Sequence, residues 1–182
     1  MKQLLTLLVV GVGCLLGTGS AWAETVLVTV TGAIERPNRD GRDDFADALF
    51  VVHDIAFDKA RAFSRLDLAA LGQHAATVTY DAWPRAVKVR GPRLADVLRA
   101  AGAATTGSVQ VQALDGYSYT FPMEMVERTP DMILAIEADG RPLAIGGRGP
   151  AWLVFPPGLL PGQDKDDGLV WAVFHLRVNA AP

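Results

Sequence analysis

Side chains that could bind a flat ring recur along this chain. Three tryptophans beyond the first 23 residues offer stacking surfaces: Trp83, Trp152 and Trp171. Asp81 lies two residues before Trp83, and Asp115 lies two residues before Tyr117. A carboxylate accepts hydrogen bonds from ring N–H groups, so these residue types favour non-covalent recognition of an aromatic ligand. Each also has an ordinary structural interpretation, since tryptophan fills cores and Asp-Gly forms turns.

The same sequence offers little for covalent or metal chemistry. Cys14 is the only cysteine, and it lies in a segment that we expect to be removed, which excludes disulfides, thiolate catalysis and iron–sulfur clusters. His53, His74 and His175 are far apart and show no metal-binding spacing. No G-x-S-x-G hydrolase signature occurs. The residues therefore favour binding over turnover.

Residues 1–23 predict a cleaved secretory signal peptide. Lys2 precedes an apolar run over residues 4–16, and Ala21-Trp22-Ala23 ends the segment with an A-x-A site. The apolar run is too short to span a bilayer as a helix. A lipoprotein modified at Cys14 is the alternative, although the residues before it lack the usual leucine. We expect a periplasmic protein comprising residues 24–182 that is not embedded in the membrane.

Patterning predicts an α+β, β-rich single domain with a few short helices. Strands are expected over residues 25–31, 76–81, 108–114, 117–121, 132–137, 141–145, 151–155 and 169–178. Helices are expected over residues 64–72, 92–101 and 122–128. Residues 36–63 form an excursion without a clear pattern. The net charge of −3 and the scattered arginines exclude a typical nucleic-acid binder.

Five motifs in a fixed order carry a family resemblance. They are Gly91 to Leu98 (GPRLADVL), Ala113 to Tyr117 (ALDGY), Ile133-Leu134-Ala135 with Asp139 to Leu143, Gly149 to Pro156 (GPAWLVFP), and Val170 to Val178. Together they resemble the molybdopterin-binding domain of the sulfite oxidase fold, over roughly residues 64–179. The resemblance implies that fold and a pterin-type cofactor.

Three positions depart from the family pattern. Thr79 stands where the family has its molybdenum-binding thiolate, four residues before Trp83. A threonine hydroxyl is a hard donor that is not ionised near neutral pH, which makes it a poor ligand for that metal. Trp152 and Trp171 replace an arginine and a lysine that suit the cofactor phosphate. Replacing these two cations with indole rings removes positive charge and adds a flat apolar surface. The change favours a neutral pterin without a phosphate tail.

The resemblance then implies a binding set without catalytic or metal residues: Thr79, Asp81, Trp83, Asp115, Tyr117, Arg148, Trp152 and Trp171. Thr79 offers one hydrogen bond, and Arg148, in a glycine-rich loop, suits a ring carbonyl. Taken alone, Thr79 is an ordinary strand residue and Arg148 an ordinary solvated loop charge.

Small exported members of the family that lack the cysteine look like periplasmic pterin-binding proteins. Such proteins partner a membrane-bound enzyme of cyclic-di-GMP metabolism. The resemblance therefore implies a non-catalytic pterin-binding protein that signals to a membrane partner. The alternative is a molybdenum-cofactor oxidoreductase with atypical metal ligation, and a third interpretation is an interaction scaffold that has lost its ligand.

Overall fold

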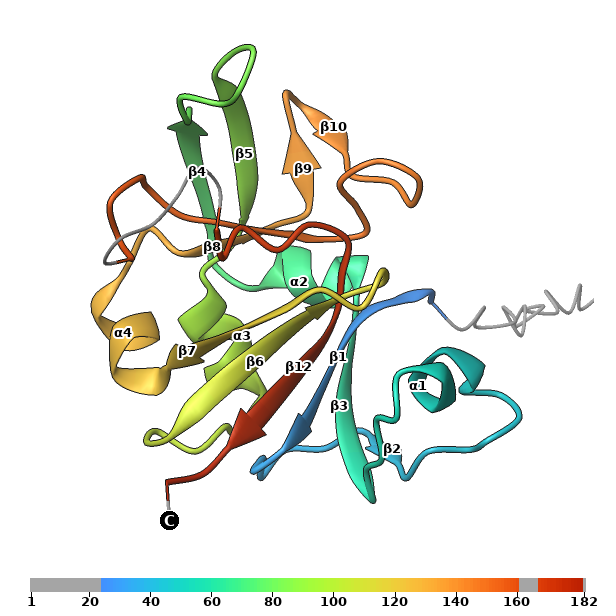
Figure 1. Ribbon diagram of the computed structural model, residues 1–182. Coiled ribbons are helices and arrows are strands. Elements are labelled where there is room, and N and C mark those ends of the chain that lie inside the picture. The colour runs from blue at the N-terminus through green and yellow to red at the C-terminus, as the bar shows by residue number, and fades with distance from the viewer. Residues whose placement is uncertain (1–23, 161–166, 182) are drawn as a thin grey trace, which may run out of the picture.

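A six-stranded mixed sheet forms the centre of the computed structural model, which describes residues 24–160 and 167–181 (Figure 1). Its strand order is β2-β3-β1-β12-β6-β7. These strands are β1 (Val26–Gly32), β2 (Arg39–Asp40), β3 (Lys59–Ser64), β6 (Ser108–Ala113), β7 (Ser118–Pro122) and β12 (Val173–Asn179). β1 and β12 pair in parallel, and the other neighbours are antiparallel. The expected signal peptide, residues 1–23, lies outside the described residues.

Two smaller sheets lie above the large one in Figure 1. The four-stranded sheet has the order β10-β9-β5-β4. Its strands are β4 (Gln73–Val78), β5 (Val87–Pro92), β9 (Glu137–Ala138) and β10 (Arg141–Pro142). β8 (Ile133–Ala135) pairs antiparallel with β11 (Trp152–Val154), and all six of their residues are buried.

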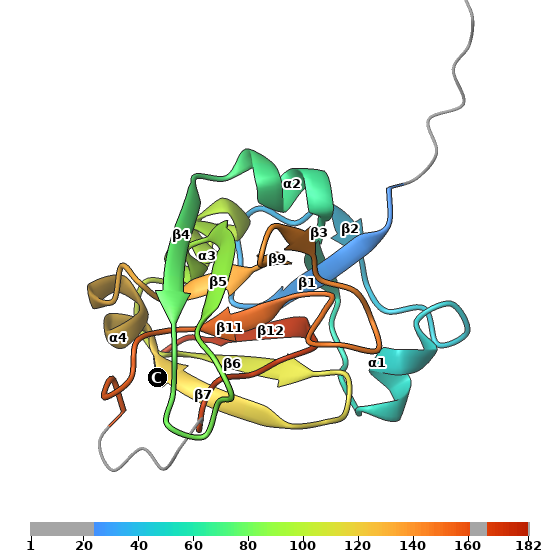
Figure 2. The ribbon, with the colours of Figure 1, turned by 90° about the horizontal axis from the view of Figure 1, so that it is seen from above.

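Four short helices complete the fold: α1 (Ala48–Val52), α2 (Arg65–Ala70), α3 (Leu94–Ala101) and α4 (Met123–Arg128). Figure 2 shows α1 and α4 at opposite ends of the molecule, with α2 and α3 between them. Among the described helices, none has the length and apolar character needed to cross a membrane.

The large sheet separates two apolar clusters. Along β1, Val28 and Val30 face the main core, which also holds the buried face of α3. The intervening Thr29 and Thr31 are buried on the opposite face, because side chains alternate along a strand. A second, smaller core covers that face, built from Phe50, Ile55 and Phe174 with Phe57 and Leu114 packed against it. The excursion that contains α1 is therefore packed onto the sheet.

A capping box fixes the start of α2. The Ser64 hydroxyl accepts a hydrogen bond from the Asp67 amide at 3.1 Å, and the Asp67 carboxylate accepts one from the Ser64 amide at 2.9 Å. The two bonds satisfy backbone donors that lack partners within the helix. The Ser64 amide, and the Ser64 hydroxyl that donates to the same carboxylate at 2.8 Å, hold the pKa of Asp67 below its usual value.

We predict that Ser64→Ala lowers the free energy of unfolding by about 1 kcal/mol, the usual effect of losing a helix cap. Urea denaturation measures the change. Ser118→Ala serves as the control, because the Ser118 hydroxyl accepts a hydrogen bond from the Gln110 side chain at 3.1 Å and caps no helix. An equal loss in both variants would contradict the capping argument.

The fold class predicted from the sequence is confirmed, and so are most elements. Three strands were not predicted, β2 and β3 within the supposed excursion and β5 after the Trp83 turn. The strand expected over 76–81 lies at 73–78, and the last strand begins at Val173 instead of 169. Ala172 explains the late start, because its φ of 52° interrupts an extended strand.

Candidate functional site

A cluster of aromatic rings with mutually tilted planes, which we call the aromatic stack, follows the end of β4. The rings of Trp83 and Trp152 lie 5.2 Å apart between centroids, and the Tyr80 ring lies 5.1 Å from that of Trp83. The guanidinium of Arg148 lies 4.5 Å from the Trp152 ring centroid and 5.5 Å from that of Trp83. The electron-rich face of an indole ring attracts a positive charge placed over it, which is a cation–π interaction. Three of the sequence-predicted residues therefore meet at one place.

Burial differs sharply between the two tryptophans. Trp152 lies in β11 and is 1% exposed, whereas Trp83 is only half-buried. Neither indole Nε1 atom has a hydrogen-bond partner within the described part of the chain. A buried polar atom without a partner is uncommon and calls for an explanation. Tyr80 is satisfied, because its hydroxyl donates to the carbonyl of Phe155 at 2.7 Å.

A second group of predicted residues lines a separate cavity of about 270 Å³. Its walls are Asp115, Tyr117, Asp167, Leu169 and Trp171. Tyr117 is 44% exposed and Trp171 is 42% exposed, so both rings present surface to an incoming molecule. The Tyr117 hydroxyl also accepts a hydrogen bond from the Gly168 amide at 3.3 Å. The cavity volume is close to the lower end of the roughly 300–1,000 Å³ range of small-molecule sites.

Backbone hydrogen bonds join the segments that carry the two groups. The amide of Ala172, directly after Trp171, donates to the carbonyl of Arg148 at 3.0 Å. The amide of Leu114, directly before Asp115, donates to the carbonyl of Ala172 at 3.0 Å. The aromatic stack and the cavity therefore lie on neighbouring segments.

The remaining predicted residues have simpler surroundings. Thr79 and Asp81 are exposed in the segment between β4 and Trp83. The Asp115 carboxylate accepts a hydrogen bond from the Tyr117 amide at 2.9 Å, which is the turn role that Asp-Gly already indicated. Asp115 therefore stabilises the β6–β7 hairpin in addition to lining the cavity.

Sequence reasoning missed Tyr80 and Asp167. Tyr80 stands between two predicted residues, and its alternation with Val78, which is also buried, was the available signal. Asp167 ends the stretch Asp164-Lys165-Asp166-Asp167, whose charged residues are typical of a solvated loop. The structure places Asp167 in the cavity wall, and residues 164–166 lie outside the described residues.

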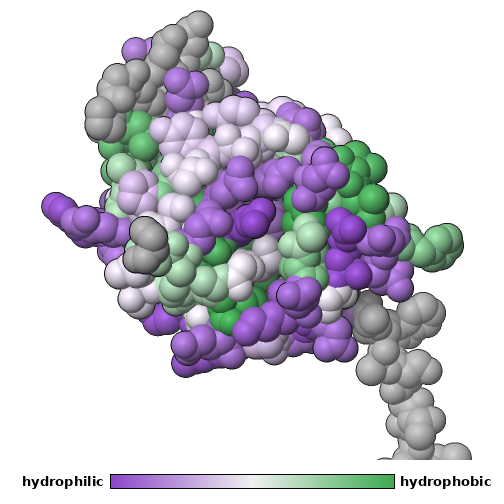
Figure 3. All heavy atoms as spheres, turned by 60° about the horizontal axis from the view of Figure 1, so that its bottom comes forward, coloured by the Kyte–Doolittle hydropathy of each residue, from purple (hydrophilic) through white to green (hydrophobic). Residues whose placement is uncertain are grey.

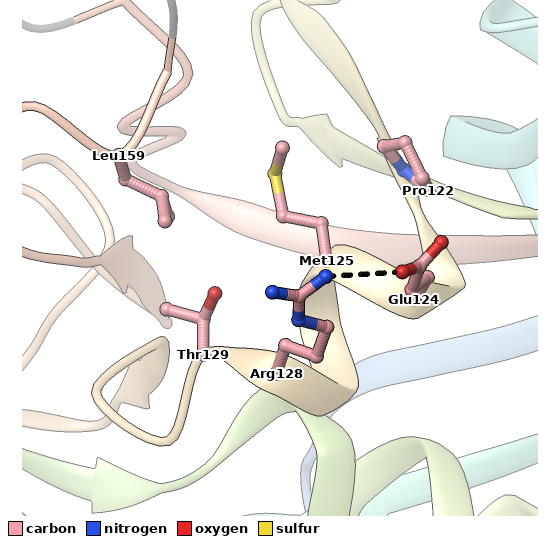
Figure 4. Close-up of a pocket in the computed structure, with 6 residues that line it drawn as sticks. All are labelled: Pro122, Glu124, Met125, Arg128, Thr129 and Leu159. Atoms are coloured by element: carbon pink, nitrogen blue, oxygen red, sulfur yellow. Dashed lines mark hydrogen bonds and ion pairs between the residues drawn. The ribbon is translucent and has the colours of Figure 1, made fainter.

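A larger cavity, of about 370 Å³, contains none of the predicted residues. Pro122, Glu124, Met125, Arg128, Thr129 and Leu159 line it. Figure 4 shows Met125 and Leu159 beside the opening and an ion pair between Arg128 and Glu124, whose closest atoms are 3.2 Å apart. Both members of the pair are largely exposed, and exposed ion pairs contribute little. Cavity volume alone therefore does not identify the candidate ligand-binding site.

Comparison with known proteins identifies the family. Residues 72–159 match the family described as "Oxidoreductase molybdopterin binding domain". This segment belongs to that family. The resemblance inferred from the five motifs is thereby confirmed. No curated protein sequence is significantly similar to the chain.

A solved structure supports the same fold. The sulfane dehydrogenase SoxCD from Paracoccus pantotrophus matches with a TM-score of 0.56 and 17% sequence identity. The match covers 86% of this chain but only 38% of the SoxCD chain. At this identity the likeness shows the fold of the molybdopterin-binding domain and nothing of the activity.

The donors available here fit a pterin ring better than a molybdenum ion. At the position where the resemblance places the family thiolate, this chain has the exposed Thr79. No group of three or more histidine, cysteine, aspartate or glutamate residues in the described ranges could hold a metal ion. The aromatic stack offers a flat ligand the half-buried ring of Trp83, while the two indole N–H groups without partners are themselves buried.

Proposed function

We propose that this chain is a periplasmic, non-catalytic pterin-binding protein that signals to a membrane partner such as a cyclic-di-GMP enzyme. The family makes a pterin or molybdopterin the expected ligand class. The observation that carries the narrower proposal is the aromatic site. Trp83, Trp152 and Arg148 form one side of it, and the cavity with Trp171 and Tyr117 lies on the neighbouring segment.

Each component has a role in the proposed complex. The half-buried ring of Trp83 supplies a face for stacking, and the guanidinium of Arg148 donates hydrogen bonds that suit a ring carbonyl. The carboxylate of Asp115 accepts hydrogen bonds from a ring N–H edge. The cavity is small and has acidic residues in its wall, which favours a simple pterin over one with a phosphate tail.

The test is to purify the mature protein from the periplasm, release bound small molecules with acid, and measure pterin fluorescence and molybdenum together. Pterin without molybdenum would support the proposal. Stoichiometric molybdenum would restore the alternative, a molybdenum-cofactor oxidoreductase with atypical ligation. The absence of both would leave the scaffold interpretation.

We predict that Trp83→Leu weakens pterin affinity about tenfold, because an aromatic contact contributes up to about 1.5 kcal/mol beyond burial. Fluorescence titration with oxidised pterin measures the dissociation constant. Tyr119→Leu is the matched control, since Tyr119 is also half-buried and packs against one ring, that of Phe121 at 4.7 Å. Equal weakening in both variants would indicate general damage to the fold and would contradict a role for Trp83.

A further inference from the structure

Segment 43–52, a turn followed by α1, exposes several apolar side chains. Phe45 is 95% exposed, Val52 is 75% exposed and Leu49 is 39% exposed. Leu49 and Val52 lie three residues apart on one side of α1, and Phe45 lies in the turn that precedes the helix. Apolar side chains come to the surface beside polar ones on the right of Figure 3, the side on which α1 lies in Figure 1.

A groove connects this segment to the loop that carries Arg148. It has a volume of about 270 Å³, and its lining includes Leu49 of α1, Val26 of β1 and Ile145. Ile145 is itself 75% exposed. It lies three residues before Arg148, whose guanidinium covers the tryptophan stack. A molecule seated in the groove would therefore contact the same loop that forms one wall of the candidate site.

Local hydrogen bonds hold the exposed Phe45 in place. The Asp43 carboxylate accepts hydrogen bonds from the amides of Phe45 and Ala46, at 2.9 and 2.7 Å. These bonds hold the pKa of Asp43 below its usual value, so it is ionised at neutral pH. The Asp47 carboxylate accepts from the Asp43 amide and pairs with Arg39. These bonds fix the backbone of the turn, so less backbone entropy is lost when the exposed Phe45 side chain enters an interface.

The charge around this apolar surface is negative. Residues 39–59 contain six aspartates against Arg39, Arg42 and Lys59, a formal net charge of −3, and Arg39 is already paired with Asp47. Arg42 is already engaged by Asp44, with closest atoms 2.8 Å apart. Such a surface repels both a second copy of itself and an anionic membrane. It is complementary to a partner whose apolar recess is edged by lysine or arginine.

We propose that segment 43–52, together with Ile145, is the docking surface for a partner protein that presents an apolar recess with a basic rim. The inference rests on the proposed function, because it identifies the surface through which the site with Arg148 reaches its partner. Phe45 is the central anchor. The aspartates at 54 and 58 steer the basic rim.

The test is photo-crosslinking in cells that express the full-length chain, with p-benzoylphenylalanine in place of Phe45. Leu66 is the matched control position, because it is 69% exposed on α2, whose buried Leu68 belongs to the core on the opposite face of the sheet. We expect one discrete adduct with another protein from position 45 and none from position 66. The adduct should disappear in Asp54→Lys/Asp58→Lys.

The partner captured in this way is then purified and its affinity measured directly. Phe45→Ser should weaken binding about thirtyfold, the effect of losing an interface anchor, while Leu66→Ser should leave affinity unchanged. Both variants should keep their pterin content. Adducts only with a second copy of the chain, adducts only with lipid, no adduct from position 45, or an adduct that survives charge reversal would each overturn the proposal.

The two proposals fail separately. Bound pterin without a specific adduct from position 45 would remove the docking surface and keep the pterin site. A specific, charge-dependent adduct from a protein without pterin would keep the docking surface and remove the proposed ligand.

Discussion

Gly91→Ala should destabilise the protein by about 3 kcal/mol or more, and we expect little folded protein at 37 °C. Gly91 lies in β5, directly against β8. A Cβ atom at this position would lie 2.1 Å from the backbone carbonyl oxygen of Leu134 and 2.8 Å from the Cα atom of Ala135. Backbone atoms cannot rotate away, so the two strands would have to separate, and overpacking of this kind is strongly destabilising.

Urea denaturation of the two proteins side by side measures this effect. Gly72→Ala is the control, because a Cβ atom there would meet only the His74 side chain, at an ordinary 3.6 Å. We expect that variant to differ from the parent by no more than about 0.5 kcal/mol. If Gly91→Ala were as stable as Gly72→Ala, the close approach of β5 to β8 would be wrong.

Lowering the pH from 7 to 4 should cost about 3 kcal/mol of stability through His175 alone. This side chain is 1% exposed, and its Nε2 atom lies 2.8 Å from the Thr31 hydroxyl oxygen. Burial lowers its pKa to about 4, from 6.5 in an exposed histidine, and the nearby charges of Arg177 and His53 add to the effect.

The sign follows from the number of protons bound. Between pH 6.5 and 4 the unfolded chain protonates His175 while the folded protein does not, so stability falls as the pH falls. The contribution is fully present above pH 6.5 and is lost by about pH 4. A pKa difference of about 2.5 between the folded and unfolded states corresponds to a maximum loss of about 3.4 kcal/mol of stability. About 3 kcal/mol of this is already lost at pH 4.

The measurement is urea denaturation at several pH values between 7 and 4, for the parent and for His175→Gln. Glutamine keeps a hydrogen-bonding group near Thr31 and does not titrate, so the variant should lose much less stability over this interval. Carboxylates titrate in both proteins, which is why the difference between the two curves is decisive. Parallel curves would show that His175 does not titrate as we expect.

The location of His175 suggests which part of the protein responds first. Its ring contacts that of Phe50 at 5.8 Å, and Phe50 belongs to the second core that holds the α1 segment on the sheet. His175 lies beneath that segment. Protonation should therefore loosen the α1 segment before it affects the main core.

The sequence predicts a helix or strand well where a strong hydrophobic pattern is followed by a clear termination signal. α3 has both, with one apolar face and Gly102 at its C-terminus in a left-handed conformation with φ of 67°. β3 lacked such a signal because two of its buried residues are Ala60 and Ala62. Small residues there leave room for the second core, which is a tertiary requirement that no local pattern reveals.

The candidate site shows the same limit. Residue types and family motifs identified the tryptophans, but they could not show that Trp83 and Trp152 stack together while Trp171 lines a different cavity. The contact between Arg148 and both indoles depends on a loop that returns to the end of β4 from far along the sequence. Tyr80 was missed because its alternation with Val78 indicates only that the side chain is buried, and not that it belongs to a binding site.

The parallel pairing of β1 with β12 has a consequence for how the chain folds. β12 is the last element of the described chain, yet it lies between β1 and β6 near the middle of the large sheet. Until residues 173–179 are synthesised, β1 and β6 have no common neighbour and the sheet cannot close. Pairing between strands so distant in sequence makes folding slow and places it after synthesis. A chain truncated before Val173 should therefore fail to form the domain at all, however complete its helices and hairpins are.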